Sequence, residues 1–125
     1  MKKSKHLERV KLWLPVFLWA TVIFTLSSIP QIKVSEFILW DFAAKKTAHV
    51  IEYAILYSLI FRATHFNLVR SFLLTMAYAA SDEYHQSFVP GRTSSLIDLV
   101  IDLGGASIAS YRCHILYKST TVRKN

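Results

Sequence analysis

Cysteine, glycine and proline are scarce in this sequence of 125 residues, which has one cysteine, three glycines and three prolines. The lone Cys113 excludes a disulfide within the chain and is typical of a small buried side chain rather than a reactive thiol. With so few glycines and prolines, no linker or low-complexity segment is visible. The length therefore predicts a single domain over residues 1–125, with its core at about 12–116 and a basic tail at each end.

Acidic residues are also few, because the chain has eight Asp and Glu against fifteen Lys and Arg, for a net charge of +7. The positive charges gather at the two ends and in short connections instead of forming one stripe, which argues against a nucleic-acid partner. Hydrophobic residues make up 53% of the chain, more than is usual in a soluble protein. This distribution is typical of a membrane protein whose basic ends face the cytoplasm.

Four apolar segments are visible, at residues 12–29, 47–63, about 68–81 and about 95–116. The first has no charge and is long enough to cross a bilayer, whereas a signal peptide, the alternative, would be shorter and carry a cleavage site. A soluble four-helix bundle is a further alternative, although no segment has the broad charged face that such a helix needs. We therefore predict an all-α fold, a compact bundle of about four transmembrane helices with both termini cytoplasmic and the connections 31–47 and 84–94 outside.

Carboxylates cluster near the predicted outer ends of the second, third and fourth segments. Charges inside a span are costly and usually face the bundle interior or a wet cavity, so their convergence predicts a polar pocket that opens outward. The cluster consists of Glu52, Asp82, Glu83, Asp98 and Asp102, beside His49, His85, Lys45, Lys46 and Arg92. The alternative is purely structural: Arg92 pairs with Asp82 or Asp98 to fix helix register, and His49 bonds Glu52.

Local spacing refines this picture. Pro90 and Gly91 predict a tight turn that brings Arg92 back over the carboxylates. Ser94 or Ser95 is expected to cap the fourth helix, one turn before Asp98. Gly104 and Gly105 would let a neighbouring helix approach closely.

The ordered residues of this region form a motif: Lys46-x-x-His49-x-x-Glu52-Tyr53, then Ser81-Asp82-Glu83-x-His85-Gln86-x-Phe88-x-Pro90-Gly91-Arg92-x-x-Ser95-x-x-Asp98, then Gly105. With Phe24-Thr-Leu-Ser27-Ser28 before it, the motif resembles the VanZ-like family of bacterial membrane proteins. The resemblance implies a small multi-pass protein of the bacterial cell membrane. The family's named member is associated with resistance to the glycopeptide antibiotic teicoplanin. The sequence departs from the family at Lys45, where an acid is common, and at Asp102, where Asn is common.

The candidate site residues fall into two sets. Those expected to carry chemistry or direct binding are His49, Glu52, Asp82, His85, Arg92 and Asp98. Those expected to assist in ligand binding are Lys46, Glu83, Gln86, Ser95 and Asp102.

Three functions are consistent with these residues. The first is binding or modification of a cell-envelope molecule that is lipid-linked or bears a phosphate, with the bilayer and that precursor as partners and Arg92, Lys45 and Lys46 as cations. The second is a hydrolase or transferase, in which His85 or His49 is the general base, oriented by Asp82 or Glu52, and Arg92 stabilises an oxyanion. The third is a transporter or a structural subunit. No resident cofactor is expected; a divalent metal is an alternative without a strong spacing signature, and homo-oligomers are left open.

Overall fold

The computed structural model describes residues 2–30, 38–92 and 95–123, and these form four helices. They are α1 (Lys2–Ser27), α2 (Ile38–Ala63), α3 (Leu68–Gln86) and α4 (Leu96–Val122). The described residues contain no strand, which confirms the predicted all-α fold of four helices.

The helices are longer than the apolar segments that predicted them. Helix α1 starts at Lys2 instead of residue 12, so most of the expected basic N-terminal tail is helical. Helix α2 starts at Ile38, inside the predicted connection 31–47, of which residues 31–37 lie outside the described chain. The reason is that Lys, Arg, Glu and Ala are good helix formers, so a helix continues past the apolar residues that first mark it.

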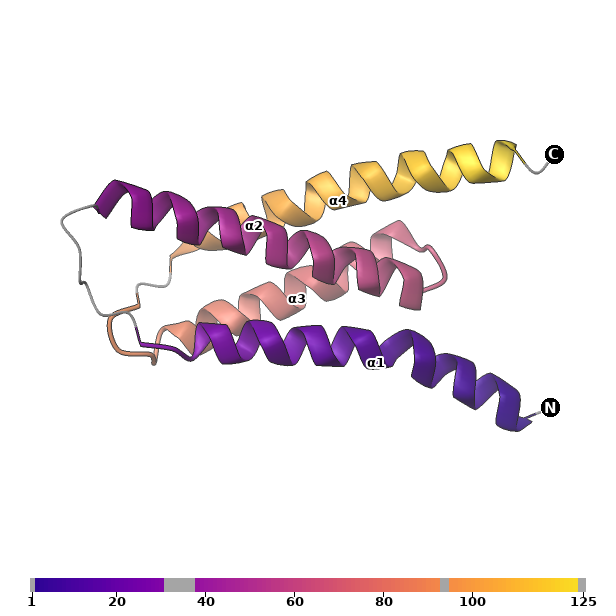
Figure 1. Ribbon diagram of the computed structural model, residues 1–125, viewed down its shortest axis with the longest axis horizontal. Helices are drawn as coiled ribbons and strands as arrows, with labels where there is room; N and C mark the ends of the chain where they lie inside the picture. The colour runs from indigo at the N-terminus through magenta and orange to yellow at the C-terminus, as the bar shows by residue number, and fades with distance from the viewer. Residues whose placement is uncertain (1, 31–37, 93–94, 124–125) are drawn as a thin grey trace.

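Helices α2 and α3 occupy the middle of the molecule, with α1 and α4 on either side (Figure 1). The two middle helices contact each other and both outer helices, whereas α1 and α4 share no contact in the described chain. The beginning of α1 and the end of α4 lie at one end of the bundle (Figure 1). The opposite end, where α1 and α3 finish and α2 and α4 begin, is the end that gathers the polar residues.

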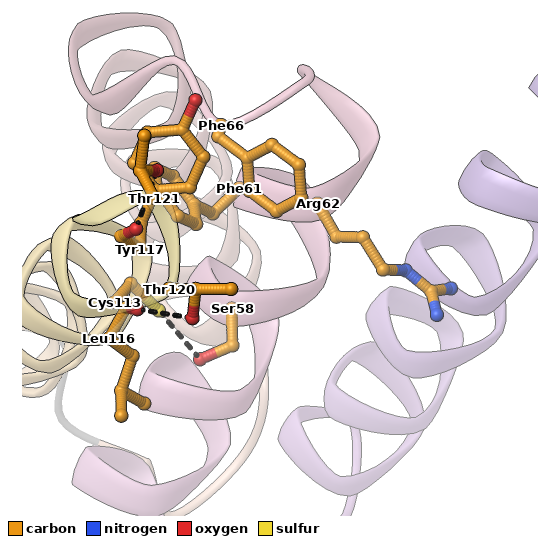
Figure 2. Close-up of a pocket in the computed structure, with 9 residues that line it drawn as sticks. All are labelled: Ser58, Phe61, Arg62, Phe66, Cys113, Leu116, Tyr117, Thr120 and Thr121. Atoms are coloured by element: carbon orange, nitrogen blue, oxygen red, sulfur yellow. Dashed lines mark hydrogen bonds between the residues drawn. The ribbon is translucent and has the colours of Figure 1, made fainter. Parts of the chain in front are cut away.

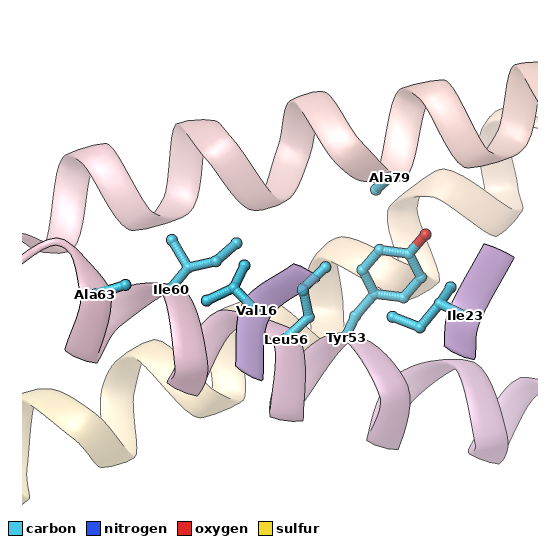
Figure 3. Close-up of a cluster of buried hydrophobic side chains, with 7 residues drawn as sticks. All are labelled: Val16, Ile23, Tyr53, Leu56, Ile60, Ala63 and Ala79. Atoms are coloured by element: carbon cyan, nitrogen blue, oxygen red, sulfur yellow. The ribbon is translucent and has the colours of Figure 1, made fainter. Parts of the chain in front are cut away.

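The hydrophobic core joins α1, α2 and α3 along the axis of the bundle (Figure 3). Its buried members are Val16, Ile23, Tyr53, Leu56, Ile60, Ala63 and Ala79. The one fully buried residue that helix α3 contributes to this layer is the small Ala79, and the same buried face also holds Ser71 and Thr75. Small residues let helix backbones approach closely. The same buried stripe of α3 continues into Asp82, Glu83 and Gln86, so the packing of the core fixes the position of these polar groups.

The surface of the bundle is strongly apolar. Among the described residues, 28 large hydrophobic side chains are exposed, whereas 12 hydrophobic residues are buried. One helix in this part of the chain, over Ser4–Ser27, is long and apolar enough to cross a membrane.

Candidate functional site

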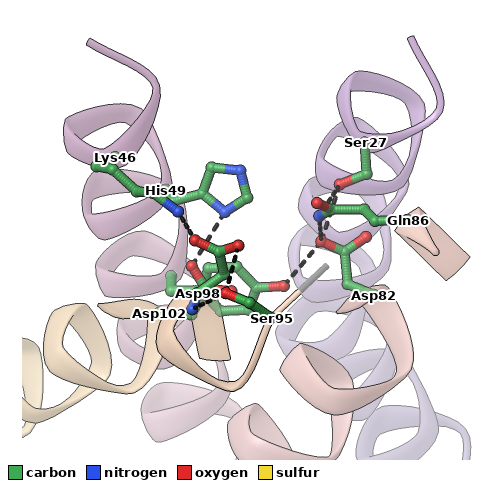
Figure 4. A network of polar contacts seen from close by, with 9 residues as sticks. Ser27, Lys46, His49, Asp82, Gln86, Ser95, Asp98 and Asp102 are labelled. Carbon is green, nitrogen blue, oxygen red and sulfur yellow. Dashed lines mark hydrogen bonds and ion pairs between the residues drawn. The ribbon is translucent and has the colours of Figure 1, made fainter. Parts of the chain in front are cut away.

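Polar side chains from all four helices meet at the end of the bundle opposite the termini (Figure 4). They form two groups that face each other. One group lies between α2 and α4, and the other lies where α1, α2 and α3 come together (Figure 4).

Asp82 of α3 is the centre of the second group, and its side chain is only 2% exposed. Its Oδ2 atom accepts hydrogen bonds from Ser27 Oγ at 2.8 Å, Tyr53 OH at 3.1 Å and Gln86 Nε2 at 2.8 Å. Gln86 also donates to Ser27 Oγ at 3.2 Å. Hydrogen bonds to a charged group are worth about 1.5–3 kcal/mol each, so this carboxylate ties α1, α2 and α3 together.

The first group is built around Asp102 of α4, which is 1% exposed. Its Oδ1 atom lies 3.0 Å from Nδ1 of His49 on α2. One turn earlier on both helices, Lys46 forms an ion pair with Asp98. The two pairs hold the beginning of α4 against the beginning of α2.

Ser95 caps the N-terminus of α4, and it is one of the two serines predicted for this role. Its Oγ atom accepts a hydrogen bond from the backbone N–H of Asp98 at 3.2 Å and donates to Asp98 Oδ2 at 3.0 Å. The other predicted cap, Ser94, lies outside the described residues. Because the cap holds Asp98, it also positions the carboxylate for Lys46.

Arg92 does not pair with Asp82 or Asp98, so the purely structural alternative for this residue is wrong. The predicted turn forms, with Gly91 at a φ of 77°, but it directs the guanidinium to the end of α1. Nη2 donates to the carbonyl of Leu26 at 2.7 Å and Nε donates to that of Ile29 at 3.2 Å. The last carbonyls of a helix have no partner within it and carry partial negative charge, so a cation is favoured there.

His85 is not oriented by Asp82, contrary to the expected acid–base pair. Its Nε2 atom lies 2.9 Å from Ser28 Oγ, and its ring stacks on Phe24 with centroids 4.2 Å apart. The bonding oxygen of Asp82 is already shared by three donors, and Gln86, one full turn along α3, takes the place beside it.

Glu52 and Glu83 stand apart from both hydrogen-bonded groups. The expected His49–Glu52 pair does not form, because His49 Nδ1 bonds Asp102. Glu83 is 8% exposed. Within the described residues, its two carboxylate oxygens, Asp82 Oδ1 and Asp102 Oδ2 are buried without a hydrogen-bond partner. Leaving such atoms unpaired costs about 1–3 kcal/mol or more each, so they are acceptors suited to a donor group.

A pocket of about 470 Å³ opens between the end of α1 and the beginning of α2. It brings together His49, Glu52 and Arg92 from the candidate set and adds Lys45. The remaining candidates, namely Lys46, Asp82, Glu83, His85, Gln86, Ser95, Asp98 and Asp102, do not line it. Several of them instead position residues of the pocket wall by hydrogen bonds. Asp102 bonds His49, and Asp82 and Gln86 bond Ser27, which also lines the pocket.

Metal binding was the alternative for His49, Glu52, Asp82 and His85. Within residues 2–30, 38–92 and 95–123, no group of three or more His, Cys, Asp or Glu side chains is placed to hold a metal ion.

A family model described as VanZ/LLP1 matches residues 2–117 of the chain. The chain belongs to the VanZ/LLP1 family. The match spans α1, α2, α3 and most of α4, and it confirms the resemblance of the polar motif. No curated protein and no solved structure matches the chain significantly.

Two residues of this VanZ/LLP1 protein belong to the site although the sequence analysis did not select them, because Ser27 and Tyr53 both donate to Asp82. Lys45, expected as a cation of the cluster, lines the pocket. Ser27 and Tyr53 stand in the sequence stretches that carry the family resemblance, so the signal for them was present. A serine and a tyrosine within apolar runs resemble ordinary buried residues, and only the structure shows that both reach the same carboxylate.

Proposed function

We propose that this VanZ/LLP1 protein binds a phosphate-bearing, lipid-linked molecule of the cell envelope in the pocket between α1 and α2. The observation that carries this proposal is the composition of the pocket wall. Lys45 and Arg92 supply cationic groups, His49 supplies a ring nitrogen, and Glu52 supplies a carboxylate for a sugar hydroxyl or an amine. Leu26, Ile29 and Pro30 add an apolar side against which a lipid tail would lie.

We also propose that all four helices cross the membrane, with the pocket on the outer side. The supporting observation is the excess of exposed over buried hydrophobic residues, 28 against 12 in the described chain, since apolar side chains gain free energy when they leave water for lipid. The buried carboxylates of α3 and α4 face other helices, as charges inside a membrane protein usually do. The basic residues near the beginning of α1 and the end of α4 support a cytoplasmic location for that end.

A pair of matched probes tests phosphate recognition. We would titrate the purified full chain in detergent with a polyprenyl phosphate and with the polyprenol of the same length. Tighter binding of the phosphate is the expected result. Lys45→Gln should reduce that preference about tenfold, since a hydrogen bond to a charged group contributes about 1.5–3 kcal/mol.

Lys118→Gln is the charge-matched control, because Lys118 is an exposed residue of α4 that lies outside the pocket wall. This control should leave the preference unchanged. Equal affinity of the wild-type chain for phosphate and alcohol would falsify phosphate recognition.

A second candidate function, a hydrolase or transferase, is favoured by the His49–Asp102 pair. Asp102 fixes the Nδ1 side of the ring at 3.0 Å, and the second ring nitrogen of His49 points away from Asp102 (Figure 4). Because His49 also lines the pocket, that nitrogen is placed to take a proton from water during attack on a phosphate ester. The leaving group would receive a proton in turn, as general acid–base catalysis requires.

Release of inorganic phosphate from a polyprenyl diphosphate separates this second function from simple binding. An enzyme should release phosphate, and His49→Gln should slow release by about 10²–10⁴-fold. His6→Gln, a change at an exposed histidine of α1, should leave release unchanged. If the wild-type chain binds the diphosphate but releases none, the enzyme function is rejected and the binding function stands.

We propose that any protection against a glycopeptide antibiotic depends on this same pocket. Expression of the chain in a susceptible bacterium should raise the inhibitory concentration of teicoplanin, and Lys45→Gln should lower it again. If the wild type and Lys45→Gln protect equally at equal expression, resistance does not depend on the pocket.

A further inference from the structure

A second hollow lies at the opposite end of the bundle, where α2 ends and α4 finishes (Figure 2). It is a groove of about 650 Å³, within the size range of typical ligand pockets. We call it the terminal groove. Its wall consists of Ser58, Phe61, Arg62, Phe66, Cys113, Leu116, Tyr117, Thr120 and Thr121.

Three aromatic rings form the rigid side of the terminal groove. Phe66 stacks on Tyr117 with centroids 5.0 Å apart and meets the edge of Phe61 at 5.5 Å. Phe66 lies in the turn after α2, which has an unusual backbone conformation. The φ angles of His65 and Phe66 are left-handed, at 54° and 65° respectively. The N–H of Phe66 closes this turn on the carbonyl of Phe61 at 2.8 Å. Left-handed backbone at bulky residues is strained and tends to mark functional sites.

The chain segments that form the terminal groove carry cations and no acids. The guanidinium of Arg62 extends from one edge toward α1, away from the aromatic rings (Figure 2). Residues 53–81 and 103–123, which include both walls of the groove, contain no acid. The same segments carry the cations Arg62, Arg70, Arg112, Lys118 and Arg123.

We propose that the terminal groove binds one acyl chain of an anionic phospholipid, with the headgroup beside Arg62. The aromatic and aliphatic wall suits the hydrocarbon, while the cation at the edge and the absence of acids suit an anionic headgroup. Ser58, Thr120 and Thr121 supply hydroxyl groups along the groove. This inference rests on the proposed membrane location but not on the headgroup pocket, which lies at the other end of the bundle.

The test compares two lipids with the same acyl chains, phosphatidylglycerol and phosphatidylcholine, bound to the full chain in detergent and counted by native mass spectrometry. One cation near a headgroup is worth about 1 kcal/mol, so wild type should prefer the anionic lipid about fivefold. Arg62→Gln should remove this preference. Arg112→Gln, which changes a neighbouring exposed arginine outside the groove wall, should keep it.

A second pair of variants tests the groove itself. Thr120→Trp places a large side chain in the wall, so it should reduce binding of both lipids. Ser119→Trp adds the same side chain one residue away, outside the wall, and should not. Both positions are exposed, so both variants are expected to fold.

Two results would overturn the proposal. The first is an equal lipid preference in Arg62→Gln and Arg112→Gln. The second is unchanged lipid binding in Thr120→Trp; if the wild type self-associates and this variant does not, the groove belongs instead to a second copy of the chain. Lys45→Gln should leave this lipid in place, so failure here is distinguishable from failure of the outer pocket.

Discussion

Gly105 brings α4 against the backbone of α2, and its replacement by alanine should separate these helices. A Cβ atom at this position would lie 3.0 Å from the Cα of Val50 and would collide with the Val50 carbonyl oxygen. Both are backbone atoms, so no side-chain rotation relieves the contact. At the neighbouring Gly104, a Cβ would meet nothing within 4 Å.

The two glycines form a matched pair for measuring the cost of that contact. Replacing glycine by alanine inside a helix gains up to about 1 kcal/mol of intrinsic propensity, and this gain is the same at both positions. Overpacking a tight contact costs typically about 1–3 kcal/mol. Gly105→Ala should therefore be about 1–3 kcal/mol less stable than Gly104→Ala.

Unfolding by SDS in mixed micelles, followed by circular dichroism, measures this difference in stability. The two variants would be compared under identical lipid and detergent conditions. Gly105→Ala should also weaken binding of polyprenyl phosphate, because Val50 follows His49 and separation of the helices stretches the 3.0 Å bond to Asp102. If the two variants unfold at the same SDS fraction, the reasoning from close helix approach is wrong.

Three further experiments probe the polar network, with stability measured by the same SDS titration. Tyr53→Phe removes one of three donors to Asp82 and should cost about 1.5–3 kcal/mol; a loss near zero would show that the other two donors suffice. Arg92→Ala removes the hydrogen bonds to the carbonyl of Leu26, in the last turn of α1, and to that of Ile29, just after it, and should destabilise the chain more than Arg92→Lys, which keeps the charge. Lys46→Gln and Asp98→Asn should show a coupling of about 0.5–3 kcal/mol in a double-mutant cycle, and strictly additive losses would exclude a direct pair.

The four helices were predictable because each contains an apolar run with few breakers. Their ends were not, because residues such as Lys2 and Lys11 form helix as readily as they form a solvated tail. The connection expected over residues 31–47 shows the same effect, since Lys45 and Lys46 lie well inside α2. Hydropathy marks the apolar part of each helix, and helix propensity extends the helix beyond that part.

The site was predictable as a gathering of residues but not as a set of pairs. Helical spacing and the positions of acids near helix ends place His49, Asp82 and Asp102 at one end of the bundle. Which residues pair by hydrogen bonds depends on how one helix is rotated relative to another. The spacing of residues within a single helix does not determine that rotation. His49 therefore bonds Asp102 and not Glu52, although Glu52 is closer in sequence.

Arg92 illustrates a competition that charge counting misses. Carboxylates were the expected partners, but free carbonyl groups at the end of α1 lie within reach of the turn that carries this residue. Backbone carbonyls are present in every sequence and leave no mark in its composition.

In the four-span arrangement proposed above, the hydrogen bonds of Asp82 would impose an order on membrane insertion. Helix α3 carries two adjacent acids, Asp82 and Glu83, and it follows α1 and α2 along the chain. Ser27 and Tyr53 would then be available as donors when α3 enters the membrane, so Asp82 would meet helices that already offer it partners. A chain permuted to start at α3 would present that carboxylate to lipid before either donor exists, and α3 should be retained outside the membrane or degraded.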